Sequence, residues 1–140
     1  MSTISFFVDG VPAPQGSKTG FIRNGRVVLT EASKKVKPWR TRIANQSAEC
    51  LDKPLEVPVR VFLEFVMPRP KYLGSGDAPP MSVKPDLDKL VRSSLDGITG
   101  TILKDDSLVV SLEASKRRAR PGEQTGAFFM IREIAHEKAA

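Results

Sequence analysis

The feature that most constrains the fold of this 140-residue chain is a strict apolar alternation between Glu56 and Met67. Every second residue from position 57 to position 67 is valine, leucine, phenylalanine or methionine. Successive side chains of a β-strand point to opposite faces, so this period of two predicts a strand with one buried face. Because Pro58 has no backbone N–H, we expect the start of this strand to lie at a sheet edge.

Other segments with strand signals surround this one. Alternating or β-branched runs predict strands at residues 3–8, 108–114 and 126–134. In residues 20–29, Asn24 and Gly25 stand between two apolar runs, which predicts a hairpin with a type I′ turn. The basic segment 115–122 contains proline and glycine, and we expect it to form the turn between the last two strands.

Two segments have helical periodicity. Residues 38–51 begin with a proline suited to a first helical position and repeat apolar residues at a spacing of three to four. Residues 87–98 carry a second apolar stripe, and Asp86 is placed to cap its first turn. Polar residues spaced by four share the opposite face: Asp88, Arg92 and Asp96. The expected fold is α+β, one domain over residues 1–140 with a single mixed β-sheet and two helices packed on it.

Several protein classes are excluded by composition. No apolar run approaches the roughly 20 residues of a membrane-spanning helix, and the first residues do not resemble a secretory signal, so we expect a cytoplasmic protein without a membrane partner. Cys50 and His136 are the only cysteine and the only histidine, which excludes an internal disulfide and a Cys/His zinc site. A metal ion would be held by oxygens, as Mg²⁺ and Mn²⁺ prefer.

The charge of the chain is unevenly distributed. The net charge is +6, yet five of the 16 acidic residues and only three of the 22 basic ones fall between positions 86 and 106. The rest of the chain is therefore strongly basic, which favours an anionic partner. An acidic centre in a basic protein is typical of an enzyme that cuts phosphodiesters, since the basic surface binds the backbone and carboxylates hold a metal ion.

Two pairs of carboxylates lie in this acidic segment. Asp86 and Asp88 are one residue apart where an extended, proline-containing segment becomes a helix, so both can point toward one ion. Asp105 and Asp106 precede a predicted strand, and one of them can complete such a site. A structural explanation stays open, with Asp86 as a helix cap, Asp88 as a surface partner of Arg92, and the second pair as a solvated turn.

The order of these motifs carries a resemblance. Residues 86–88 read Asp-Leu-Asp, residues 93–97 read Ser-Ser-Leu-Asp-Gly, and residues 104–110 place Asp-Asp before an apolar strand. Together with the proline-rich segment 10–18, which ends in lysine, they resemble the RusA family of Holliday junction resolvases. That family's core pattern is D-x-D-N, a lysine, D-A-L, and D-D before a hydrophobic strand, and the likeness covers most of the chain.

The resemblance implies a site as well as an activity. It implies that Asp86, Asp88 and Asp106 ligate Mg²⁺, with Mn²⁺ as an alternative, for phosphodiester hydrolysis in DNA recombination and repair. The chain differs from the family at Lys89, where asparagine is usual, and at Arg92, where the family has a functional lysine. Arginine stays charged and forks onto phosphate oxygens, so Arg92 can stabilise charge but is unsuited to a general-acid role.

Basic residues in several segments are expected to contact branched DNA. The candidates are Lys18, Arg23, Arg26, Lys71, Lys89, Arg117 and Arg118. Residues 68–85, with five prolines, are expected to form a long loop that either touches DNA through Lys71 and Tyr72 or is a mobile linker. Paired cuts at a four-way junction suggest a homodimer, as the resemblance also implies.

Two other functions remain open at the level of sequence. The first is a non-catalytic module that binds branched nucleic acid and whose Arg92 marks lost activity, and metal dependence would separate it from an enzyme. The second is a nuclease selective for flaps or other branched structures. Trp39, Phe62 and Phe65 fall on patterned segments and are expected in the core or a subunit interface rather than stacked on bases.

Overall fold

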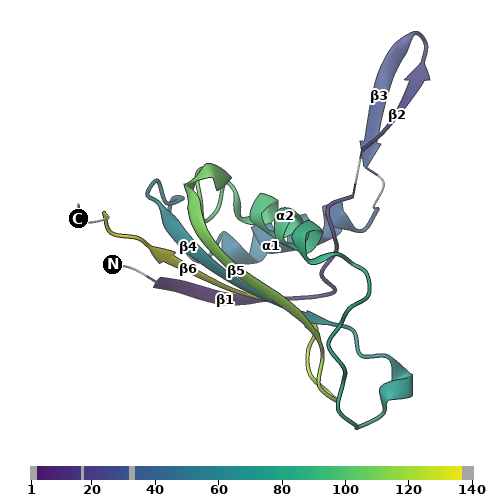
Figure 1. Ribbon diagram of the computed structural model, residues 1–140. Coiled ribbons are helices and arrows are strands. Elements are labelled where there is room, and N and C mark those ends of the chain that lie inside the picture. Colours follow the sequence, from purple (N-terminus) through teal and green to yellow (C-terminus); the bar gives the residue numbers. More distant parts are fainter. Residues whose placement is uncertain (1–2, 17, 32–33, 137–140) are drawn as a thin grey trace.

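The computed structural model describes residues 3–16, 18–31 and 34–136 (Figure 1). The elements in chain order are β1 (Thr3–Asp9), β2 (Lys18–Arg23), β3 (Arg26–Glu31), α1 (Val36–Ser47), β4 (Val59–Met67), η1 (Lys71–Leu73), α2 (Leu87–Ile98), η2 (Asp106–Leu108), β5 (Val109–Arg118) and β6 (Gly126–Glu133). A mixed sheet and two helices make up the main body, which confirms the predicted α+β class. No helix in the described ranges has the length and hydropathy needed to cross a membrane.

The main sheet has four strands in the order β1-β6-β4-β5. The pairs β1–β6 and β6–β4 are antiparallel, whereas β4 and β5 are parallel. The strands β2 and β3 form a separate two-stranded sheet that extends away from the main one in Figure 1. The turn that joins them has positive φ at both Asn24 and Gly25, as the predicted type I′ hairpin requires.

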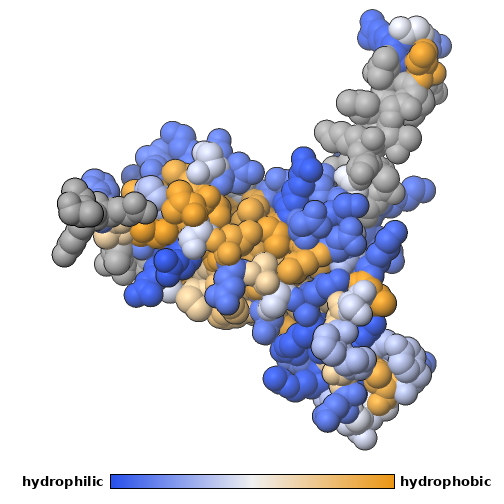
Figure 2. Space-filling view, viewed as in Figure 1, coloured by the Kyte–Doolittle hydropathy of each residue, from blue (hydrophilic) through white to orange (hydrophobic). Residues whose placement is uncertain are grey.

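The core lies between the main sheet and the two helices. Trp39 of α1 and Phe65 of β4 are almost fully buried there, which confirms their predicted place in the core. The helices approach closely where Gly97 of α2 faces Ile43 of α1, because a Cβ added at Gly97 would lie 2.9 Å from the Ile43 side chain. Hydrophobic residues gather over the middle of the sheet in Figure 2. Phe62 is only half-buried, and its ring centroid lies 6.2 Å from that of Phe128.

Several predicted positions differ in the structure, and the first of them is the start of α1, at Val36 rather than at Pro38. The first helix ends at Ser47 rather than at residue 51, because the Cys50 N–H donates to the Ser47 carbonyl only three residues back. The strand β4 begins just after Pro58, and it lies inside the sheet rather than at an edge. The strand β5 continues to Arg118, so the predicted turn at 115–122 is shorter.

Candidate functional site

The helix α2 presents a stripe of charged side chains to solvent. Asp88, Arg92 and Asp96 are all exposed, and their spacing of four residues places them on one side of the helix. Neither Asp88 nor Arg92 forms an ion pair or a side-chain hydrogen bond with any other residue that the structure describes. The structural alternative in which Asp88 pairs with Arg92 is therefore wrong, and both groups stay available to a ligand.

Asp86 occupies the N-cap position of α2 but does not cap it. Its backbone is extended, with φ −66° and ψ 138°, and its carboxylate makes no capping hydrogen bond. The nearest cation is the Lys89 ammonium, 3.9 Å from Asp86 Oδ2 and itself about half exposed. The sequence prediction of a capping role is wrong, because the carboxylate is not used by the helix N-terminus.

The segment that leads into Asp86 is fixed from β5. Lys116 Nζ donates to the carbonyl oxygen of Val83 at 2.7 Å and to that of Pro85 at 2.8 Å. Each bond joins a charged donor to a main-chain acceptor, the stronger class of hydrogen bond. Lys116 thereby holds the chain immediately before Asp86 against the end of β5.

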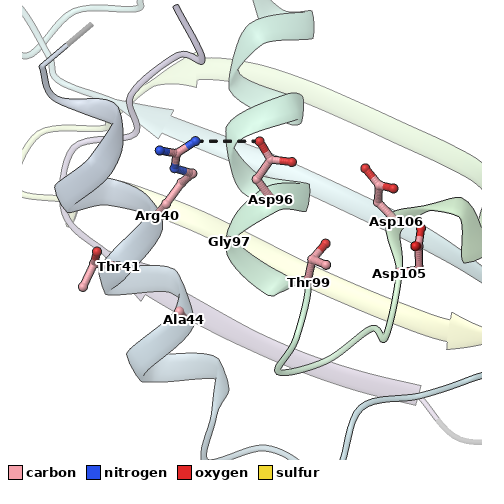
Figure 3. A pocket seen from close by; sticks show the side chains of 8 residues that line it. All are labelled: Arg40, Thr41, Ala44, Asp96, Gly97, Thr99, Asp105 and Asp106. Carbon is pink, nitrogen blue, oxygen red and sulfur yellow. Dashed lines mark ion pairs between the residues drawn. The ribbon is translucent and has the colours of Figure 1, made fainter. Parts of the chain in front are cut away.

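At the other end of α2 the helix meets a pocket of about 510 Å³ (Figure 3). Arg40 of α1 lines one side, and Asp96 of α2 lies opposite with 3.9 Å between their charged atoms. Asp105 and Asp106 line the same pocket from the turn before β5. Three carboxylates and one guanidinium thus face one solvent-filled space.

The two neighbouring aspartates of this turn differ in what they do. Asp105 Oδ1 accepts a hydrogen bond of 2.8 Å from the Ser107 backbone N–H and caps the short helix η2. This hydrogen bond holds the pKa of Asp105 below its ordinary value. Asp105 therefore has a local structural role, and its carboxyl group also interacts with that of the exposed Asp106.

The predicted metal ligands do not converge within one chain. Asp88 precedes Asp96 by eight residues, which is about 12 Å along a helix axis, and Asp106 lines the pocket at the Asp96 end. In the part of the chain that the structure describes, no three His, Cys, Asp or Glu side chains are grouped so that they could hold a metal ion. The carboxylates at the start of α2 and those near its end form two separate groups.

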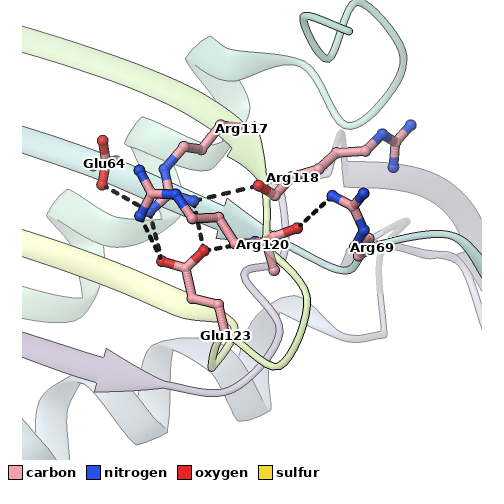
Figure 4. Close-up of polar contacts among 7 residues, drawn as sticks. Glu64, Arg69, Arg117, Arg118, Arg120 and Glu123 are labelled. Carbon is pink, nitrogen blue, oxygen red and sulfur yellow. Dashed lines mark hydrogen bonds and ion pairs between the residues drawn. The ribbon is translucent and has the colours of Figure 1, made fainter. Parts of the chain in front are cut away.

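The predicted DNA contacts fall into different environments. Arg117 is engaged by the protein itself: its two terminal nitrogens each lie 2.7 Å from an oxygen of Glu123, and Glu64 is 3.4 Å away (Figure 4). This pairing raises the pKa of Arg117 and lowers that of Glu123 to about 2. Lys71, Lys89 and Arg26 are exposed, and Arg118 is half-buried. The side chains of Lys18 and Arg23 lie outside the described residues.

Sequence reasoning missed three residues that build this region. Arg40 has the sequence position of an ordinary charge on the solvent face of a helix. Lys116 belongs to the segment 115–122 predicted as a turn, and Glu123 directly follows that segment. Only their partners identify them: Asp96 for Arg40, two carbonyls for Lys116, and Arg117 for Glu123. The apolar alternation ends at Ala114, and residues 115–118 are all polar or charged, so no sequence pattern indicates that the strand continues to Arg118.

Comparison with known proteins agrees with the arrangement of these motifs. A curated protein of Bacillus subtilis (strain 168), described as "Uncharacterized protein YqaN", is 31% identical over 146 residues, covering 96% of this chain and 99% of its own length. The family model described as "Endodeoxyribonuclease RusA" matches residues 9–125, which include both acidic pairs, Arg92 and the whole of α2. The chain belongs to the RusA family of endodeoxyribonucleases.

Proposed function

We propose that this protein is an endonuclease that resolves four-way DNA junctions by Mg²⁺-dependent hydrolysis, acting on cytoplasmic DNA in recombination and repair. The observation that carries the proposal is the pair of exposed carboxylates at the start of α2, Asp86 and Asp88. Asp86 makes no cap and Asp88 has no partner among the described residues. Asp86 has only the Lys89 ammonium, 3.9 Å away, as an ionic partner. Such exposed carboxylates in a chain of net charge +6 have a clear use if they bind a cation at bound DNA.

The site residues that we propose are Asp86, Asp88 and Asp106 as ligands of Mg²⁺ or Mn²⁺, with Arg92 beside them. Oxygen ligands suit these hard cations, which would supply charge neutralisation at the scissile phosphate. The three carboxylates of one chain do not form a complete donor set, because they lie toward opposite ends of α2. Arg92 lies one helical turn after Asp88 and can donate two hydrogen bonds to a phosphate while keeping its own proton.

We propose that a second copy of the chain completes the site. A twofold axis across α2 would run the two helices antiparallel and bring the start of one helix toward the partner's Asp106. The strand β5 is an edge of the main sheet, and it exposes 63% of Val110 and 44% of Leu112. Apolar side chains on an edge strand beside α2 favour an interface there. Such a dimer has two equal sites, as paired cuts require.

The first experiment offers the purified protein a labelled four-way junction, a flap and a linear duplex, with Mg²⁺, Mn²⁺ or chelator. We expect symmetric, metal-dependent cuts confined to the junction. Asp88→Asn should abolish cutting while binding in chelator persists or tightens, because a carboxylate that repels phosphate is gone. Asp52→Asn, a change at an exposed aspartate outside the stripe, is the matched control. Wild-type cutting by Asp88→Asn would refute the site.

The shared site has its own test. Asp88→Asn and Asp106→Asn are each expected to be inactive, but a mixed dimer of the two would hold one intact site composed of Asp88 from one chain and Asp106 from the other. Mixing the inactive variants should therefore restore single nicks rather than paired cuts. If the mixture stays inactive although the subunits exchange, each site lies within one chain.

The alternative function is a non-catalytic module that binds branched DNA. The observation in its favour is Arg92 in the place of the family lysine. The same experiment decides between the two, since junction binding without cutting in either metal ion would establish the binding module. If the protein cuts the flap in preference to the junction, it is a nuclease with a different preferred substrate.

A further inference from the structure

We infer that a groove between the 69–81 segment and the end of β5 binds a stretch of DNA phosphate backbone through Arg118 and Arg120. The inference rests on the proposed function only in taking DNA as the ligand. The groove has a volume of about 570 Å³. Its charged lining residues are Arg69, Lys116, Arg117, Arg118, Arg120 and Asp77. Five cations therefore face one anion.

Two of these cations build the walls of the groove. The Arg69 guanidinium donates to the carbonyl of Gly74 at 2.9 Å, to that of Ala119 at 3.2 Å, and to that of Gly76. It thus ties the loop after β4 both to itself and to the segment that follows β5 (Figure 4). Lys116, through its bonds to Val83 and Pro85, ties the far end of the same loop to β5. These bonds fix the loop at both ends, so less conformational entropy is lost when a ligand binds in the groove.

A third cation, Arg117, is neutralised by the protein. Glu123 engages both of its terminal nitrogens, and Glu64 lies on its other side. Glu123 also accepts a hydrogen bond of 2.7 Å from the Arg120 backbone N–H, which fixes the turn that carries Arg120. The Glu123 carboxylate therefore fixes the rim of the groove, and it neutralises the charge that Arg117 would otherwise present to a ligand.

Arg118 and Arg120 keep most of their donors for a ligand. The Arg120 side chain is 77% exposed, and its nearest acid, Glu123, is 3.8 Å away and already bonded to Arg117. The Arg118 guanidinium has one long contact, 3.4 Å to the Pro68 carbonyl, and it extends away from the Arg117–Glu123 pair in Figure 4. An arginine fork matches the spacing of phosphate oxygens, so these two side chains form an anion site.

The basic path continues from the groove toward α2. Arg118 also lines a neighbouring pocket of about 560 Å³ together with Lys35, Lys84 and Pro85. Pro85 directly precedes Asp86, so a DNA backbone that follows these cations reaches the carboxylates at the start of α2. The lining of the groove contains no aromatic residue among those described, which favours contact with phosphates over stacking on bases.

The test measures binding in chelator, where no cutting occurs, by fluorescence anisotropy of a labelled junction at several salt concentrations. Arg118→Ala with Arg120→Ala should weaken binding by at least about tenfold near 0.1 M salt and reduce the slope of log affinity against log salt by about 2, as for two lost phosphate contacts. The matched control is Arg60→Ala with Arg132→Ala, which removes equal charge from paired positions on the main sheet.

Each outcome bears on the inference separately from the proposed activity. An unchanged salt slope in the Arg118/Arg120 variant, or an equal loss in the control, would overturn the groove assignment even if the wild type cuts junctions. The converse outcome is a wild type that cuts no substrate, while the Arg118/Arg120 variant alone shows lower affinity and a smaller salt slope. That result would support the groove and refute the nuclease. Folding of each variant is checked by thermal denaturation.

Discussion

Replacing Glu123 by glutamine tests the ion pair that holds the turn between β5 and β6. The two contacts of 2.7 Å with Arg117 and the bond from the Arg120 backbone lower the pKa of Glu123 from 4.5 to about 2. At about 1.4 kcal/mol for each pH unit, this difference corresponds to about 3 kcal/mol. Because 26% of the side chain is exposed, solvent screening reduces the expected contribution to about 1–2 kcal/mol.

The pH dependence of this contribution has a definite sign. A carboxylate whose pKa is lower in the folded state stabilises the protein above its unfolded pKa, near 4.5, and loses that effect as the pH falls toward 2. Glu123→Gln should therefore destabilise the protein at pH 7 by about 1–2 kcal/mol, and the gap should shrink by roughly half between pH 5 and pH 3.

The assay is urea unfolding of the wild type and of Glu123→Gln across this pH range. Glu49→Gln, a change at an exposed glutamate in the turn after α1, controls for the loss of a negative charge. In an Arg117→Met background the effect of Glu123→Gln should largely disappear, because its main partner is gone. A stability gap that stays constant with pH, or one that the Glu49 control reproduces, would refute the assignment of this energy to the ion pair.

Two further predictions concern the helices. Gly97→Ala should destabilise the protein by about 1–3 kcal/mol, because the new methyl group would lie 2.9 Å from Ile43; denaturant unfolding measures this, and an unchanged midpoint would mean that α1 can move aside. Lys116→Gln should speed amide hydrogen exchange in residues 82–90, since the bonds to Val83 and Pro85 are lost; exchange equal to the wild type there would show that Lys116 does not fix the approach to α2.

Much of the fold was predictable from local patterns. The alternation of β4, the apolar stripe of α2 and the turn at Asn24 depend on near neighbours in sequence, and each was confirmed. The strand order was beyond prediction, because the parallel pairing of β4 with β5 joins residues about 50 positions apart. The same limit applies to Arg117, which pairs with Val66 of β4 and forms an ion pair with Glu123 across the following turn.

For the candidate site, sequence located the acidic residues but not their relations. A D-x-D motif at a helix start is compatible with capping, and only the geometry of Asp86 removes that explanation. The length of α2 separates Asp88 from Asp106 within one chain, and a motif pattern carries no information about such a distance. Residue spacing predicts which side chains share a helix face, whereas convergence on one point depends on packing between elements.

The position of β6 in the sheet sets the order in which the chain can fold during synthesis. This strand is the last of the sheet to be made, yet it alone joins β1 to the other strands, with Val8 paired to Ala127 and Leu63 to Phe129. Until residue 126 has left the ribosome, β1 has no partner in the main sheet. The first strand therefore waits longest, with an open hydrogen-bonding edge and two phenylalanines that a holding chaperone can cover.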